Sequence, residues 1–110
     1  MAFEVFKNDS GKFYFNLKAS NGQVILSSQG YAAKSGAMNG VQSVINHATD
    51  DGNFERKEAK DGSVFFTLKA SNGQIIGKSQ MYKAATGMEN GIASVKKNAT
   101  ADAAVKDLSA

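Results

Sequence analysis

Few side chains in this sequence could perform catalytic chemistry. His47 is the only histidine, and the chain contains no cysteine. A nucleophile with a neighbouring base, or a metal site with histidine or thiolate ligands, therefore cannot be assembled. A histidine near the C-terminal end of a helix more often meets the helix dipole than takes part in catalysis. We therefore predict that the chain is not an enzyme and holds no metal or cofactor.

Carboxylates are the remaining candidates for acid–base or metal chemistry. Five of them fall in expected turns or at strand edges: Glu4, Asp9, Asp50, Asp51 and Asp61. None has the spacing of a calcium-binding loop, and acids in turns usually stabilise the turn itself. An all-carboxylate site stays formally open but has no motif to support it.

Composition limits the class of protein. The 110 residues suit one compact domain or two very small ones. Hydrophobic residues make up 42% and charged residues 21%, which is ordinary for a soluble protein. The first residues lack a signal-peptide pattern, no apolar stretch could cross a bilayer, and the absence of cysteine fits a reducing compartment. We expect a cytoplasmic protein that does not contact membranes.

The chain is an internal duplication without gaps. A shift of 51 residues aligns 3–48 with 54–99, and 22 of these 46 positions are identical, including LKASNGQ at 17–23 and 68–74. Positions that both copies keep are those that the repeated unit needs for its fold or its function. The tail, 100–110, matches nothing in the first copy, and we expect it to fray or to form a short helix.

Each copy is predicted to form three strands and then a helix. Phe13, Phe15 and Leu17 alternate with side chains of the other face, which is typical of a half-buried strand. This strand and the one that follows it are expected to be joined by a two-residue turn with positive φ angles. The turn residues are Asn21 and Gly22 in the first copy, and Asn72 and Gly73 in the second.

The last third of each copy changes to helical spacing. Ala37, Val41, Val44 and Ala48 recur at this spacing. An Asn-Gly pair at 39–40 would favour a hairpin, but its neighbours do not alternate, so we keep the helix. Glycines one turn apart at 36 and 40 indicate close packing of this helix.

The repeated LKASNGQ, the segment SSQGY and the helix ends NGVQSVINHA and NGIASVKKNA together resemble the YegP-like family of small uncharacterised bacterial and archaeal proteins. The resemblance covers 3–99. It implies an α+β fold in which two tandem β-β-β-α repeats form one domain with pseudo-two-fold symmetry, an antiparallel sheet packed with two helices. It implies no established activity and no catalytic residues. The first copy lacks the pair Lys96 and Lys97, so any role of that pair belongs to the second copy alone.

Our preferred function is a monomeric binding or interaction module for an unknown protein or ligand. If Asn21 and Gly22 form a two-residue turn, Lys18 pairs with Ile25, and both share a sheet face with Tyr14. Phe65, Lys69 and Ile76 are their counterparts. An apolar outer face needs a cover, and we expect the partner repeat or the tail to provide it. If it is uncovered, this face is the contact surface.

Nucleic-acid binding is the alternative function. The whole net charge of +3 lies in the second half, because the first 52 residues carry four lysines and four acids. A basic sheet with aromatic residues could neutralise phosphates and stack bases. The first copy shares only Lys18 and Tyr31 with this set, and no nucleic-acid-binding motif is present. The candidates in the second copy are Lys69, Lys78, Lys83, Lys96, Lys97, Phe65 and Tyr82.

Overall fold

The computed structural model describes residues 2–19 and 21–109 and shows one seven-stranded sheet with two helices. The first repeat contributes β1 (Ala2–Lys7), β2 (Phe13–Lys18), β3 (Val24–Ser28) and α1 (Lys34–His47). A short 3₁₀ turn, η1 (Asp51–Asn53), leads into β4 (Phe54–Glu58), β5 (Val64–Lys69), β6 (Ile75–Lys78), α2 (Ala85–Asn98) and finally β7 (Ala104–Asp107). The predicted α+β fold of two β-β-β-α repeats is confirmed. No helix in the described part of the chain is long and apolar enough to span a bilayer.

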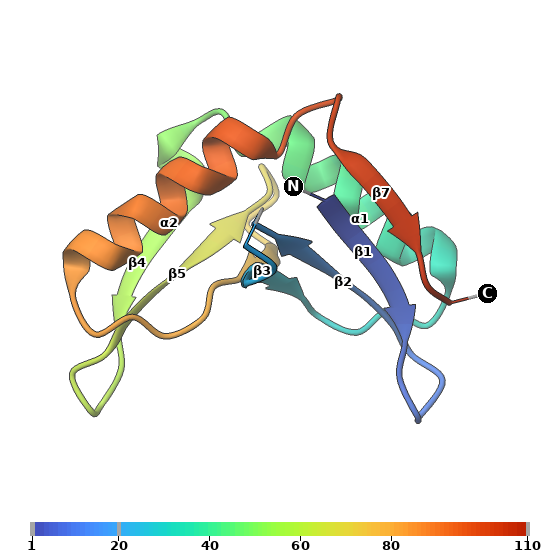
Figure 1. Cartoon of the computed structure of the whole chain (residues 1–110), viewed down its shortest axis with the longest axis horizontal. Helices are drawn as coiled ribbons and strands as arrows, with labels where there is room; N and C mark the ends of the chain where they lie inside the picture. Colours follow the sequence, from blue (N-terminus) through green and yellow to red (C-terminus); the bar gives the residue numbers. More distant parts are fainter. Residues whose placement is uncertain (1, 20, 110) are drawn as a thin grey trace.

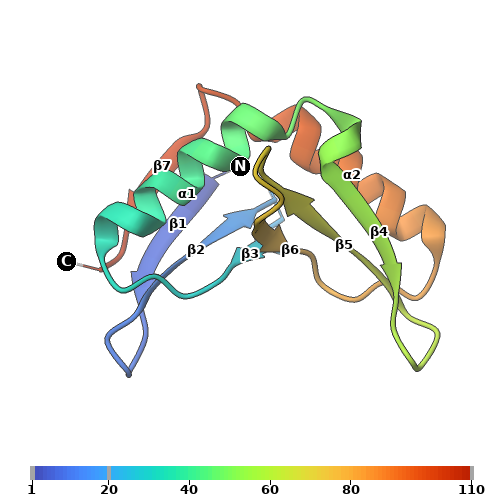
Figure 2. The ribbon, with the colours of Figure 1, turned by 180° about the vertical axis from the view of Figure 1, so that it is seen from behind.

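The two repeats join edge to edge through β3 and β6. The strand order is β4-β5-β6-β3-β2-β1-β7, and every neighbouring pair is antiparallel except β1 and β7. At the seam Ser27 pairs with Lys78, and these are equivalent positions of the two repeats. A pseudo-two-fold axis therefore passes between them. Figures 1 and 2, which differ by a half-turn, accordingly look alike with the repeats exchanged.

Both helices pack on the same side of the sheet and across the seam. α1 contacts β1 and β2 of its own repeat but also β5 and β6, and α2 contacts β3 as well as β5. Alternate strand residues such as Phe15 and Phe66 are fully buried beneath them. Burial of an apolar side chain of this size stabilises the fold by roughly 1.5–3 kcal/mol, so each helix depends on both repeats.

The helix glycines are packing positions, as predicted. The ring of Tyr31 lies over Gly36 and Gly40, and a Cβ added at Gly40 would lie 2.6 Å from the Tyr31 hydroxyl. Tyr82 lies in the same way over Gly91. Only a residue without a side chain allows this approach of ring to helix.

The turns after β2 and β5 differ from the prediction. Gly22 and Gly73 have φ angles of 85° and 84°, whereas Asn21 and Asn72 do not have positive φ. The Asn21 side chain instead accepts a hydrogen bond from the Gln23 backbone N–H at 3.0 Å. The expected two-residue turn is wrong. In the second repeat the Ala70 N–H donates to the Gln74 carbonyl at 2.9 Å, which closes a loop of three residues, 71–73, and only the glycine needs the left-handed conformation.

A β-bulge follows from this turn and changes the register. Pairing shifts between Leu17 and Lys18, so that Lys18 lies opposite Val24. A one-residue shift moves a side chain to the other face of a sheet. Ile25 and Ile76 are consequently in the core, 6% and 5% exposed, and the prediction that they face outward is wrong.

The C-terminal tail is also different from the prediction. It forms β7, which lies parallel to β1 from the Ala2–Ala104 pair to the Val5–Asp107 pair. Its side chains are exposed, and an ion pair of 2.7 Å joins Asp107 to Lys34 of α1. The tail therefore extends the sheet and does not cover a face of it.

Candidate functional site

Both helices pack on one side of the sheet, the partner repeat joins at the edge of β3 and the tail lies beside β1, so none of them covers the opposite side, here called the open face. The expected cover by the partner repeat or the tail is therefore wrong. Cross-strand partners point to the same side, so the register fixes which residues face outward. They are Glu4, Phe6, Tyr14, Asn16, Lys18, Val24 and Ser27 in the first repeat, and Glu55, Lys57, Phe65, Thr67, Lys69, Ile75 and Lys78 in the second. Of these, Thr67 is buried among its neighbours, at 3% exposed.

In the first repeat, the open face carries an aromatic pair. Tyr14 stacks on Phe6 with ring centroids 5.8 Å apart and planes inclined by 17°. The Tyr14 hydroxyl accepts a hydrogen bond of 3.4 Å from Asn8 and lies close to Gly30. Tyr14 is thus half-buried by neighbours of its own repeat rather than by a covering element.

The second repeat replaces this pair with lysines around one ring. Lys57 stands opposite Phe65, and Lys78 Nζ lies 4.8 Å from the centre of the same ring. Such a cation–π contact contributes about 0.5–1 kcal/mol at an exposed site. The open face is therefore aromatic at one end and cationic at the other.

Two equivalent ion pairs neutralise part of this charge. Lys18 contacts Glu4 at 3.0 Å, and Lys69 contacts Glu55 at 2.9 Å. The hydrogen bond from Lys69 is the main cause of the lowered pKa of Glu55. Lys78, by contrast, has no carboxylate of the described residues within 4 Å, so it keeps its charge unpaired at the centre of the face.

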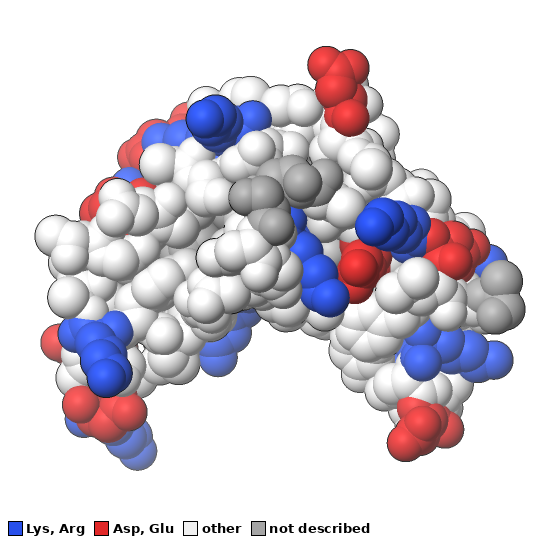
Figure 3. Space-filling view, viewed as in Figure 1, with Lys and Arg blue, Asp and Glu red and all other residues white. Residues whose placement is uncertain are grey.

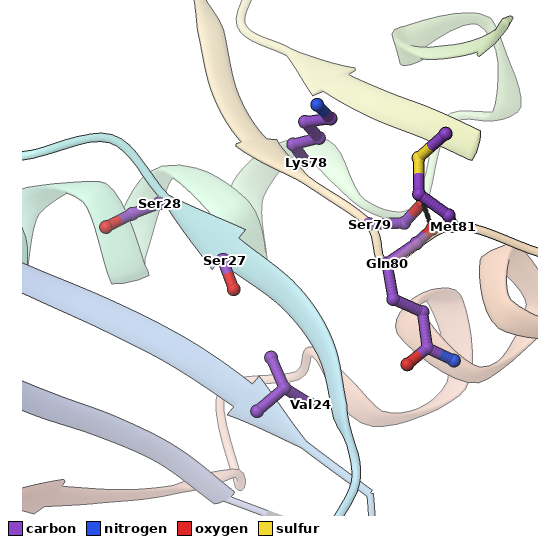
Figure 4. Close-up of a pocket in the computed structure, with 7 residues that line it drawn as sticks. All are labelled: Val24, Ser27, Ser28, Lys78, Ser79, Gln80 and Met81. Atoms are coloured by element: carbon purple, nitrogen blue, oxygen red, sulfur yellow. Dashed lines mark hydrogen bonds between the residues drawn. The ribbon is translucent and has the colours of Figure 1, made fainter. Parts of the chain in front are cut away.

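A groove of about 510 Å³ runs along the seam beside Lys78. Figure 4 shows Val24 and Ser27 of β3 on one side and the segment from Lys78 to Met81 on the other. The serine hydroxyls at its base serve the fold, since Ser79 accepts from Phe66 N–H at 2.9 Å and donates to the Gln80 carbonyl. Met81 is 46% exposed, so the groove offers an apolar contact next to a free cation.

The structure does not bring the predicted lysine and aromatic set together. Tyr31 and Tyr82 lie on the helix side, and the prediction that Tyr82 is an aromatic of the exposed face is wrong. Lys96 pairs with Asp51 at 2.5 Å, and Lys97 is exposed on α2. On the side of the molecule seen in Figure 3, basic and acidic groups are interspersed rather than gathered in one stripe.

Phe6, Lys57 and Met81 belong to the surface and were not among the predicted residues. An antiparallel pairing of β1 with β2 places Phe6 opposite Tyr14, and the same pairing in the second repeat places Lys57 opposite Phe65. This signal was present in the sequence. Met81 follows the end of β6, and only the pairing of the repeats through the seam brings it to the groove.

The single histidine has a structural position. With the proton on Nδ1, the His47 ring donates to the Ser43 carbonyl at 2.7 Å and accepts from the Ser71 backbone N–H at 3.3 Å. Both ring nitrogens are used, and they join α1 to the turn after β5 of the other repeat. No group of three metal-ligating side chains occurs among residues 2–19 and 21–109.

Comparisons with known proteins agree with this architecture. The domain family described as "Domain of unknown function (DUF1508)" matches residues 8–55 and again 59–107. UPF0339 protein YegP of Escherichia coli K12 is 47% identical over 105 residues, which cover 96% of this chain and 94% of that protein. A UPF0339 protein of Stutzerimonas stutzeri, named for its place in the ptx operon 5' region, is 47% identical over 97 residues, or 88% and 87% of the two chains.

Two solved structures have the same fold. The solution NMR structure of UPF0339 protein SO3888 from Shewanella oneidensis superposes with a TM-score of 0.92 at 44% identity, over 98% of this chain and 91% of that one. The solution NMR structure of the E. coli protein yegP gives the same TM-score and identity and is described as a protein of unknown function. The chain therefore belongs to the DUF1508 family, in the two-repeat form of the UPF0339 YegP proteins.

Proposed function

We propose that this chain is a non-enzymatic binding module whose open face receives an acidic protein partner. The observation that carries the proposal is the unpaired cation Lys78, placed beside an apolar groove on a sheet face that no described element covers. Four lysines face two glutamates on this surface. Charge complementarity of this kind guides association and selects partners.

The polar and apolar groups of the open face limit the kind of partner segment that it can bind. At the seam, an acidic side chain would meet Lys78 while an apolar one fills the groove at Met81. At the first-repeat end, Phe6 and Tyr14 offer a flat aromatic contact, and such residues are enriched at interfaces. A partner segment with acidic and apolar side chains in alternation matches both.

Nucleic acid fits this surface less well. Lys78 already lies over the Phe65 ring, so a base could stack there only by displacing it. Lys69 is paired with Glu55, and Lys96 with Asp51, which leaves few free cations for phosphates. Nucleic-acid binding is therefore kept as the alternative that nuclease treatment detects in the capture experiment.

The test is partner capture with matched variants. Lys78→Ser restores the residue that the first repeat has at position 27, and Lys97→Ser removes an equal charge from α2. We expect proteins captured from a bacterial lysate by the tagged chain to be lost with Lys78→Ser and at raised salt, but kept with Lys97→Ser. Equal capture by both variants would refute the proposal, and capture that nuclease abolishes would support the nucleic-acid alternative.

We also propose a cytoplasmic monomer. Support for the monomer comes from β4, an edge strand whose last four residues are charged, because charged edges resist pairing with another sheet. The cysteine-free composition is consistent with a reducing compartment. Sedimentation equilibrium and cell fractionation test the two statements separately.

A further inference from the structure

A second hollow lies on the other side of the sheet, where the turn after β5 approaches α1. Its volume is about 420 Å³, and its eleven lining residues come from both repeats. Ile75 alone of its lining was also placed on the open face, and neither Lys78 nor Met81 lines it, so the hollow neither depends on the function proposed above nor supports it.

The lining is unusually well kept between the repeats. Of the eleven residues, ten are identical to their counterparts 51 positions away. The single exception is Ile75, whose counterpart is Val24. Across the whole repeat only 22 of 46 positions are identical. Identity between the two copies is therefore concentrated at this hollow.

Packing accounts for only part of this identity. Tyr31, Gly36 and Gly40 are fixed by contact of the ring with the helix, and Asn72 is fixed by its turn, where it accepts from the Gln74 N–H at 3.0 Å. These residues would be retained in a purely structural repeat.

Asn39 and Gln74 have no such reason. Both side chains are exposed, and neither makes a hydrogen bond to another described residue. Asparagine inside a helix is also less favourable than alanine, by up to about 0.7 kcal/mol. Both repeats nevertheless keep it, as Asn39 and Asn90. A contact with a ligand would account for the retention of this asparagine in both copies.

The chemistry of the lining defines the ligand. It contains side-chain amides and hydroxyls but no lysine, arginine, aspartate or glutamate, so it favours an uncharged molecule. Amide groups both donate and accept hydrogen bonds, which suits hydroxyl groups that do the same. A nucleobase lacks a platform, because the Tyr31 ring is already stacked near Phe15 and packed on α1.

We propose that this hollow binds a neutral polyhydroxyl ligand of about the size of one sugar. Asn39 and Gln74 are its hydrogen-bonding residues, and His47 is a positioning residue that holds the turn at Ser71 against α1. The pseudo-two-fold axis places Asn90 and Gln23 in the corresponding positions at α2, where we expect an equivalent second site.

The experiment is an NMR titration of the full ¹⁵N-labelled chain, read at the side-chain NH₂ signals of Asn39, Gln74, Asn90 and Gln23. The probes are glucose, galactose and N-acetylglucosamine, each as the free sugar and as its methyl glycoside, with glucose 6-phosphate as the charged comparison. We expect all four signals to shift with at least one neutral probe and less with the phosphate. A preference for the glycoside would indicate the end of a glycan rather than a free sugar.

The matched variants are Asn39→Ala and Gln42→Ala, since Gln42 is exposed on the same helix outside the hollow. Asn39→Ala is expected to abolish the shift at Gln74, leave that at Asn90 and not lower the Tm, whereas Gln42→Ala changes none of the shifts. No movement with any neutral probe up to its solubility would overturn the proposal. A lowered Tm in Asn39→Ala would overturn it too, because the asparagine would then be explained by stability.

Discussion

At the scale of single residues, the hydroxyl of Tyr82 occupies the space in which a side chain at position 91 would lie. A Cβ added at Gly91 would also lie 3.2 Å from the Phe66 ring. Alanine is the better helix former by about 1 kcal/mol, but overpacking costs about 1–3 kcal/mol, and both neighbours here are held by the core. The close contact therefore makes the overall effect of alanine at position 91 destabilising.

We therefore expect Gly91→Ala to lower the free energy of unfolding by up to about 2 kcal/mol in urea denaturation. Tyr82→Phe removes the nearest atom, so the double variant should recover part of the loss. If Gly91→Ala were stabilising, the helix preference would outweigh the packing, and the ring would have to move away from α2.

At the scale of elements, the two ends of the sheet are protected in different ways. β1 is covered by β7, and Val5 is fully buried. β4 has no further strand among the described residues, and at the position of Val5 it carries Arg56, which bonds to Glu89 of α2 at 2.6 Å and to Asp51. Charge is a recognised defence of an open strand edge.

Removal of 104–110 should expose the edge of β1. We expect the truncated chain to unfold at a lower urea concentration, with a free energy of unfolding lower by about 1–3 kcal/mol. We also expect it to self-associate, as measured by light scattering. Val5→Arg in the truncated chain copies the β4 edge and should suppress the association. A truncated chain that stays monomeric without this change would mean that β7 does not protect β1.

The ion pairs at β4 should make stability depend on acid. Hydrogen bonds from Arg56 and Lys96 lower the pKa of Asp51 from 3.8 to about 2. A carboxyl group with a lowered pKa in the folded state stabilises it above the ordinary pKa, and this contribution is lost as the pH falls through the folded value. The urea midpoint of the wild type should thus fall more than that of Asp51→Asn between pH 3.8 and pH 2. Parallel curves would show that the pairs do not contribute.

The strands and helices of the two repeats were predictable from the sequence, but β7 and the details at the seam were not. Apolar periodicity outweighed the Asn-Gly signal at 39–40, and the helix was correctly predicted because period reflects burial over several turns. The predicted length of the turn at Asn21 was wrong because two-residue and three-residue loops share the same Asn-Gly signal. The resulting bulge buries Ile25. The stabilisation from this burial depends on contacts with the other repeat, and the local sequence around the turn carries no information on those contacts. The same holds for the groove beside Lys78.

At the scale of the whole molecule, the seam distinguishes the two repeats from each other. Leu26 is fully buried, and its equivalent in the second repeat is Gly77. A Cβ at Gly77 would lie 2.8 Å from Leu26 Cγ. Across the pseudo-two-fold axis, one repeat thus supplies a large side chain and the other the space for it. Two first repeats would bring two leucines together, and two second repeats would leave a cavity.

This complementarity predicts how separated repeats behave. We propose the boundaries 3–48 and 54–99, and about 46 residues bury too little surface to fold alone. Fragments 1–52 and 53–110 should each lack a cooperative thermal transition by circular dichroism and recover one when mixed in equal amounts. Gly77→Leu in the second fragment should prevent the recovery, and Leu26→Gly in the first should then restore part of it. Cooperative folding of 1–52 as a monomer would contradict the dependence of α1 on β5 and β6, because that helix would then be stable on its own three strands.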